Sequence, residues 1–119
     1  MSAILVIDDD PTALKLLQLA LGRQGHDVDV ARGMAEGKTA CQSGGYDLLI
    51  LDVFLPDGSG LDLLRHLRGE LGSTLPVLLL TGHRQPGFHS RAEAAGASGY
   101  ITKPFNLVEL LAEVDRLTG

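Results

Sequence analysis

Five polar residues whose side chains suit phosphoryl chemistry lie at the ends of apolar runs in this chain. The apolar runs span residues 4–7, 48–51, 77–80 and 100–101, and the polar residues that follow them are Asp8, Asp9, Asp52, Thr81 and Lys103. In an open parallel sheet, ligands bind outside the carboxyl ends of the strands. If the four runs are parallel strands, these five side chains therefore meet at one edge of the sheet.

Three of the five are carboxylates, which repel one another unless a cation lies among them. Oxygen ligands alone select a hard cation such as Mg²⁺. An aspartate, a hydroxyl, a lysine and a bound Mg²⁺ are the groups needed to place a phosphoryl group on a carboxylate. Helix capping before Pro11 is the simpler explanation for the first two carboxylates, but a cap needs only one of them.

The elements that must position these residues alternate between strand and helix. Apolar or alternating runs predict strands at 4–7, 28–30, 47–51, 77–80 and 99–102. Helices are predicted between them, the second at 35–42 and the fourth at 91–95, and a leucine and valine stripe predicts the last helix over 107–117. Strands alternating with helices of this length imply right-handed crossovers and a parallel sheet. The sequence therefore predicts a doubly wound, five-stranded α/β domain with helices on both faces.

Local signals define some boundaries of these helices. Asp10 followed by Pro11 predicts the start of the first helix, with Asp10 as its N-cap. The spacing of Leu61, Leu64, Leu67 and Leu71 predicts that all four form the apolar face of the third helix. Pro86-Gly87 interrupts the region before the fourth helix, which predicts that this helix is short or begins late.

Composition excludes several classes of protein. The chain has 119 residues, which predicts a single domain over 1–119, and 45% of them are hydrophobic, which excludes a disordered chain. A net charge of −5 without a basic block argues against direct nucleic-acid binding. The single Cys41 rules out an internal disulfide, and neither a signal peptide nor a membrane-spanning run is present. We expect a cytoplasmic protein without a membrane partner.

Five segments together resemble the receiver domains of bacterial response regulators, the chemotaxis type included. They are LVIDDDP at 5–11, LILDVFLPDGSG at 49–60, LLLTG at 78–82 and, within GASGYITKPF at 96–105, both the GASGY and the TKPF parts. An apolar strand that ends in aspartate is common, but this series in register over nearly the whole chain is specific. The resemblance implies the flavodoxin-like strand order 2-1-3-4-5.

The resemblance also implies roles for the acidic residues. Asp52 matches the phospho-accepting aspartate. Asp9 matches a direct Mg²⁺ ligand, and Asp8 matches the acidic residue that reaches the ion through water. The backbone carbonyl of Phe54 matches a further ligand, so the implied metal set is Asp9, Asp52, Phe54 and Asp8 with Mg²⁺ as cofactor. The bulky Phe54 side chain leaves the lifetime of the phosphoryl group open.

The remaining site residues follow from the same resemblance. Thr81, the Gly82 N–H group and Lys103 match groups that contact the phosphoryl oxygens. Thr81 and Tyr100 match the pair that switches when the domain is phosphorylated. Pro104 matches a supporting proline, which in the family usually follows a cis bond.

The implied function is that of a phospho-accepting receiver in a two-component signalling system. Its donor would be a histidine kinase or a phosphotransfer protein, and it would promote only its own phosphorylation and dephosphorylation rather than act as an enzyme. Its output would go to a downstream protein target or to an effector domain, with a homodimer as one assembly. The sequence leaves open whether the chain is a stand-alone receiver or part of a longer regulator.

Three alternatives fit the residues less well. A Mg²⁺-dependent phosphatase or phosphotransferase of the aspartyl-phosphate type needs a second aspartate two residues after the nucleophile, where this chain has Phe54. A nucleotide binder of flavodoxin type needs a phosphate-cradling first loop, and Asp8-Asp9-Asp10 would repel phosphate. The four histidines lack paired metal-ligand spacing with Cys41, although His83 could line the rim of the site.

Overall fold

The computed structural model describes residues 2–82 and 87–119. Within these residues, five parallel strands form one sheet in the order β2-β1-β3-β6-β7. Their bounds are Ala3–Ile7 (β1), Asp27–Ala31 (β2), Leu48–Asp52 (β3), Val77–Thr81 (β6) and Gly99–Thr102 (β7). Counted among themselves, these strands have the order 2-1-3-4-5, so the predicted fold and strand order are confirmed.

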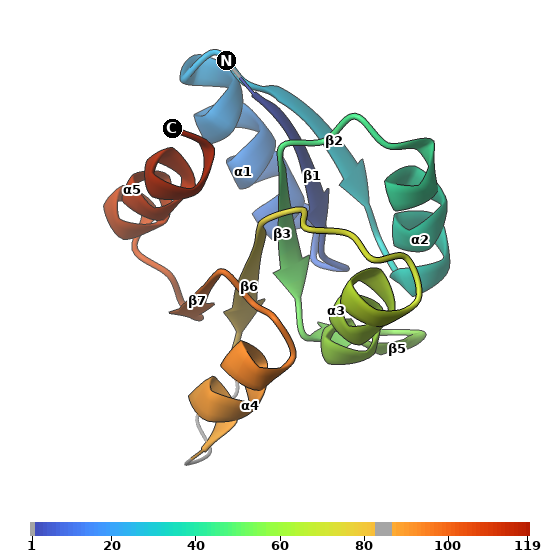
Figure 1. Ribbon diagram of the computed structural model, residues 1–119. Helices are drawn as coiled ribbons and strands as arrows, with labels where there is room; N and C mark the ends of the chain where they lie inside the picture. Colours follow the sequence, from blue (N-terminus) through green and yellow to red (C-terminus); the bar gives the residue numbers. More distant parts are fainter. Residues whose placement is uncertain (1, 83–86) are drawn as a thin grey trace.

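Helices cover both faces of this sheet, as Figure 1 shows. Helices α1 (Pro11–Arg23) and α5 (Leu107–Thr118) lie on one face. Helices α2 (Met34–Ser43), α3 (Gly60–Gly69) and α4 (Phe88–Ala94) lie on the other. Both ends of the chain lie at the end of the sheet away from the predicted site (Figure 1). None of the described helices combines the length and apolar composition that a membrane crossing requires.

Two hydrophobic cores result because neighbouring strand residues point to opposite faces. In β1, Ile4 and Val6 pack with α1 and α5, whereas Leu5 and Ile7 pack with α2 and α3. Strand β3 is buried along its whole length. Because both faces of such a strand are covered, its sequence is an unbroken apolar run. The apolar runs in this chain therefore predicted the central strands correctly.

The first helix begins as its capping signal predicts. The Asp10 side chain accepts a hydrogen bond from the Thr12 N–H at 2.9 Å, and Pro11 is the first helical residue. The second helix contains Gly37, where a side chain would collide with Ile7 of β1. A glycine that is unfavourable for the isolated helix therefore allows α2 to lie close to the sheet.

Helices α3 and α4 both have other bounds than the sequence predicts. Leu71 is not part of the third helix: α3 ends at Gly69, and Leu71 is 46% exposed. The leucine spacing continues past the helix end, so it gave the wrong assignment for this residue. The fourth helix is short, as predicted, but it spans Phe88–Ala94 rather than 91–95 and begins directly after Gly87, which has a φ of 82°. Pro86 and His83 lie outside the described residues.

A two-stranded hairpin follows β3 and was not predicted. It consists of β4 (Phe54–Leu55) and β5 (Gly58–Ser59), which pair antiparallel on either side of Pro56-Asp57. Strands of two residues are too short to show an alternating pattern. The hairpin connects the end of β3 to the start of α3, and the N–H of its first residue, Phe54, lies 3.3 Å from Asp52 Oδ1.

Candidate functional site

The predicted site residues meet at the carboxyl edge of the sheet. The arrowheads of β1, β3 and β6 point to this edge in Figure 1. Asp52 ends β3 and Thr81 ends β6, while the acidic pair follows β1 and Lys103 follows β7. The topology thus brings together side chains that are up to 95 positions apart in the sequence.

Three carboxylates form the centre of the site. Asp8 is fully buried and Asp52 is 5% exposed, whereas Asp9 is exposed. Each offers a carboxylate oxygen, and these oxygens all lie within 4.8 Å of one another. Oxygen ligands at this spacing, with one side open through Asp9, suit a hard divalent cation. The donor set of the site therefore fits Mg²⁺.

Lys103 places its ammonium between the two buried carboxylates. Its Nζ donates to Asp8 Oδ2 at 2.7 Å and to Asp52 Oδ2 at 3.3 Å. Burial alone lowers the pKa of Lys103, but the hydrogen bond to Asp8 and the negative charges of both aspartates outweigh it, so the net pKa is raised. The lysine therefore stays charged and offsets part of the carboxylate repulsion.

The ionised form of Asp52 is still unfavourable in the folded protein, in spite of this lysine. Burial is the largest cause that raises the pKa of Asp52, and the negative charge of Asp8 adds to it, against the opposing effect of Lys103. Together they raise the pKa of Asp52 to about 6. Its Oδ1 atom accepts a hydrogen bond from the Phe54 N–H at 3.3 Å, so protein donors orient both carboxylate oxygens.

The loop after Asp52 is held at both ends. The Val53 N–H donates to the Leu80 carbonyl at 3.1 Å, and the Gly60 N–H donates to the Val53 carbonyl at 2.7 Å. A side chain at Gly60 would collide with the Asp52 carbonyl oxygen. The first turn of α3 therefore packs directly against the end of β3. The Phe54 side chain is 57% exposed beside the site.

A second contact ties this loop to α2, and sequence reasoning missed it. The Asp57 carboxylate accepts hydrogen bonds from the Met34 N–H at 2.7 Å and the Ala35 N–H at 3.1 Å. These bonds lower the pKa of Asp57. At Gly33, an added Cβ would lie 2.8 Å from Asp57 Oδ1. Asp57 thus caps a helix from 22 to 23 positions away, and no local pattern signals a cap at that separation.

The remaining predicted residues frame the open side of the site. Thr81 is fully buried at the end of β6. Gly82, which follows it, is exposed, and an added Cβ there would meet no atom within 4 Å. The bond between Lys103 and Pro104 is cis, as the resemblance implied.

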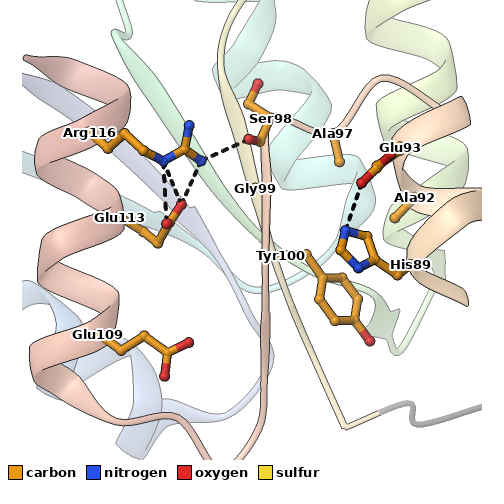
Figure 2. Close-up of a pocket in the computed structure, with 10 residues that line it drawn as sticks. All are labelled: His89, Ala92, Glu93, Ala97, Ser98, Gly99, Tyr100, Glu109, Glu113 and Arg116. Carbon is orange, nitrogen blue, oxygen red and sulfur yellow. Dashed lines mark hydrogen bonds and ion pairs between the residues drawn. The ribbon is translucent and has the colours of Figure 1, made fainter.

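Tyr100 lies on β7, next to β6, and faces α4 (Figure 2). Its ring stacks on His89 at a centroid distance of 5.2 Å and an angle of 4°, and it lies 5.7 Å from the ring of Phe88. His89 in turn contacts Glu93 at 2.8 Å. The side chain predicted to switch is therefore packed on α4 in this structure.

The other wall of the pocket in Figure 2 belongs to α5. Arg116 donates to Glu113 at 2.7 Å and to the Ser98 carbonyl at 3.1 Å, which ties α5 to the start of β7. The pocket between α4 and α5 has a volume of about 540 Å³ and runs along β7. Movement of Tyr100 would change the shape of this pocket.

Comparison with known proteins agrees with this architecture. Residues 4–115 match the family model of the response regulator receiver domain. The chain is 40% identical over 111 residues to the transcriptional regulatory protein YkoG of Bacillus subtilis, covering 93% of this chain and 48% of YkoG. It is 40% identical over 114 residues to the transcriptional regulatory protein KdpE of Mycobacterium tuberculosis, covering 96% of this chain and 50% of KdpE.

A solved structure shows the same fold. The receiver domain of Francisella response regulator 1452 matches with a TM-score of 0.94 and 27% identity, covering 99% of this chain and 97% of that domain. The chain spans about half the length of the curated relatives it matches.

Proposed function

Because the chain belongs to the response regulator receiver domain family, we propose that it accepts a phosphoryl group on Asp52 and passes the signal to the face around Tyr100. Receiver domains are signalling domains, and the relatives are transcriptional regulatory proteins. The observation that carries the proposal is the position of Asp52, nearly buried among two other carboxylates and within 3.3 Å of the Lys103 ammonium.

The transfer step needs a donor with an activated phosphoryl group, for which a phosphohistidine on a histidine kinase or phosphotransfer protein is the natural source. An Asp52 oxygen forms a bond to phosphorus as the bond between phosphorus and the histidine nitrogen breaks. The imidazole leaves with the electron pair and takes up a proton. The ionised form of Asp52 is the nucleophile, and with a pKa of about 6 it predominates at neutral pH.

The residues around Asp52 supply the charge that this step requires. Receiver domains bind Mg²⁺ at an acidic pocket, and here Asp9, Asp52 and the Phe54 carbonyl would hold the ion, with Asp8 acting through water. When bound, the ion would neutralise negative charge on the phosphoryl group. Lys103 would contact one phosphoryl oxygen, and Thr81 with the Gly82 N–H would contact another. These contacts stabilise charge that spreads over the equatorial oxygens.

The proposal extends to the context of the chain. Residues 1–119 would act as one cytoplasmic receiver domain without a membrane or nucleic-acid contact of its own. Its output would go to a protein target, to an effector domain or to a second copy. It would carry no catalytic activity beyond its own phosphorylation and dephosphorylation, because Phe54 stands where an aspartyl-phosphate enzyme needs a second acid.

Labelling with a small phosphoryl donor tests the acceptor. After incubation with acetyl phosphate and Mg²⁺, we expect the intact mass to rise by one base-labile phosphoryl group. Asp52→Asn should abolish this adduct, whereas Asp62→Asn on the exposed side of α3 should label like the wild type. Undiminished labelling of Asp52→Asn would refute the assignment of the acceptor.

A further inference from the structure

Three arginines line one pocket on the α3 and α4 side of the sheet. The pocket has a volume of about 420 Å³ and is lined by Arg65, Arg68, Arg91, Ala94 and Ala95, which together we call the arginine pocket. Arg65 and Arg68 come from the second half of α3, Arg91 and Ala94 come from α4, and Ala95 directly follows α4. The chain as a whole has a net charge of −5, yet none of the residues that line this pocket is acidic.

Arg68 is fixed in this pocket by backbone carbonyls. Its Nε and Nη2 atoms donate to the Gly96 carbonyl at 3.1 and 2.9 Å, and Nη1 donates to the Ser73 carbonyl at 3.2 Å. A Cβ at Gly96 would lie 2.8 Å from Arg68 Cγ, so the glycine makes room for the side chain. A guanidinium carries five N–H groups, and these contacts leave one on each terminal nitrogen.

The charge of this guanidinium is not balanced by an acid. Within residues 2–82 and 87–119, neither Arg68 nor Arg91 forms an ion pair with a carboxylate. Burial lowers the pKa of Arg68, as expected for a partly desolvated cation. Arg65 contacts Asp62 only at 3.4 Å, with both side chains more than half exposed, and Arg91 lies over the Phe88 ring at 5.4 Å.

We propose that the arginine pocket binds a small phosphorylated anion, with an organic phosphate such as a nucleoside diphosphate as the expected type. Arginine forks match phosphate oxygens in pairs, and three of them suit more than one negative charge. Arg68 is already held in place, so little side-chain entropy is lost when it binds. The volume of the pocket exceeds that of a bare phosphate, and Ala94 and Ala95 supply an apolar surface for the organic part.

This site is separate from the acidic site on the strand edge and does not depend on phosphorylation of Asp52. The test uses the whole chain in EDTA, so that Mg²⁺ does not link phosphate to the carboxylates. ADP, pyrophosphate and adenosine are titrated in turn and followed by amide NMR. We expect ADP to shift the amide signals of Ala94 and Ala95 in a saturable way, and adenosine to have no effect.

Variants distinguish specific binding in the arginine pocket from nonspecific electrostatic attraction to the protein surface. Arg65→Ala and Arg91→Ala should each weaken ADP binding about tenfold, because each removes a charge-assisted hydrogen-bond donor. Arg23→Ala on α1 makes the same charge change on the other face of the sheet and should leave the affinity unchanged. Arg91→Lys should restore only part of the affinity, because lysine lacks the planar fork.

Each further outcome has a defined meaning. Equal binding of pyrophosphate and ADP would support the phosphate site and assign no role to the nucleoside. Shifts confined to Thr81 and Lys103, binding unaffected by Arg65→Ala and Arg91→Ala, or no saturation at millimolar ligand would overturn the proposal. Saturation by an oligoglutamate peptide but not by ADP or pyrophosphate would also overturn it, in favour of an acidic protein segment.

Discussion

At the scale of single residues, the most unusual feature is the charge that the fold buries at Asp8 and Asp52. Two carboxylates with at most 5% exposure share one lysine. Burial of an ionised group destabilises a folded protein unless its partners fully compensate for the lost hydration. The raised pKa of Asp52 indicates that compensation is incomplete at this position. The site is therefore built for a function at the expense of stability.

Because burial of the ionised Asp52 carboxylate destabilises the fold, we expect Asp52→Asn to stabilise the metal-free protein. The folded pKa is about 6, above the ordinary value, so ionised Asp52 destabilises the fold above about pH 6 and the effect disappears as the pH falls toward about 4. At neutral pH we expect a gain on the order of 2 kcal/mol in the free energy of unfolding, which shrinks at acidic pH. Denaturant unfolding in EDTA at both pH values measures it.

Asp62→Asn is the control for that experiment, because Asp62 is exposed and only weakly paired. It should change stability little at either pH. A loss of stability in Asp52→Asn at neutral pH would mean that the Lys103 contact outweighs the burial of the carboxylate.

A second prediction at this scale concerns the metal. Asp9→Ala should weaken Mg²⁺ binding by about tenfold or more, because it removes a carboxylate oxygen from the cluster. Asp10→Ser is the matched control: it removes a neighbouring charge but keeps an N-cap side chain for α1. Titration of Mg²⁺ against amide NMR signals compares the two variants. Equal affinities would remove Asp9 from the proposed ligand set.

At the scale of elements, α3 must approach the end of β3 closely, and Gly60 allows this. A methyl group there would collide with the carbonyl oxygen of Asp52, which cannot move without shifting the strand. Gly60→Ala should therefore destabilise the protein by about 2 kcal/mol, although alanine favours helix formation. Gly69→Ala in the same helix meets no atom within 4 Å and should be neutral or slightly stabilising. Thermal unfolding of the two variants checks this contrast.

The sequence predicted the elements that have strong periodic or capping signals. The central strands appear as apolar runs because both faces of the sheet are covered, and Asp10 with Pro11 marks the start of α1. The β4–β5 hairpin was missed because two-residue strands have no period. Leu71 was misassigned because its spacing fits a helix that ends two residues earlier.

The sequence also predicted that the candidate site residues lie at the strand ends, whereas their chemical roles stay predictions. Strand ends placed Asp52, Thr81 and Lys103 together, since parallel strands end at one edge. The partners of these residues could not be predicted, because they depend on side-chain geometry. Lys103 lies closer to Asp8 than to Asp52. The stack of His89 on Tyr100 likewise joins α4 to β7, and no local sequence pattern predicts it.

At the scale of the whole molecule, the acidic site and the pocket between α4 and α5 are linked by two neighbouring strands. Thr81 ends β6, and β7, which pairs with it, carries Tyr100. A phosphoryl group would attract the Thr81 hydroxyl, and the space that this movement leaves would accept the Tyr100 ring. A ligand shifts such an equilibrium only through its different affinity for the two states. In the proposed switch, that difference would lie in the contacts of Thr81 and Lys103 with the phosphoryl group.

Thr81→Ala should therefore accept phosphate at Asp52 but switch poorly. Loss of one charge-assisted hydrogen bond should reduce the switching equilibrium by about tenfold or more. Beryllofluoride, which stands in for the phosphoryl group on the aspartate, allows an NMR comparison of wild type and variant. Thr39→Ala on the exposed side of α2 is the control. Full wild-type shift changes at Tyr100 and α5 in Thr81→Ala would disprove this coupling.

The contact of Asp57 with α2 has a consequence for the recombination of such domains. The Asp57 carboxylate, the Met34 and Ala35 amides and the small residue at Gly33 fit one another across 22 to 24 positions. A chimera whose crossover lies between residues 35 and 57 would combine a helix start from one parent with a hairpin from another. Such chimeras should melt at lower temperature than chimeras with crossovers after α3, unless both parents carry the same residues at 33 and 57. Residues 33 and 57 should therefore be exchanged together when such domains are recombined.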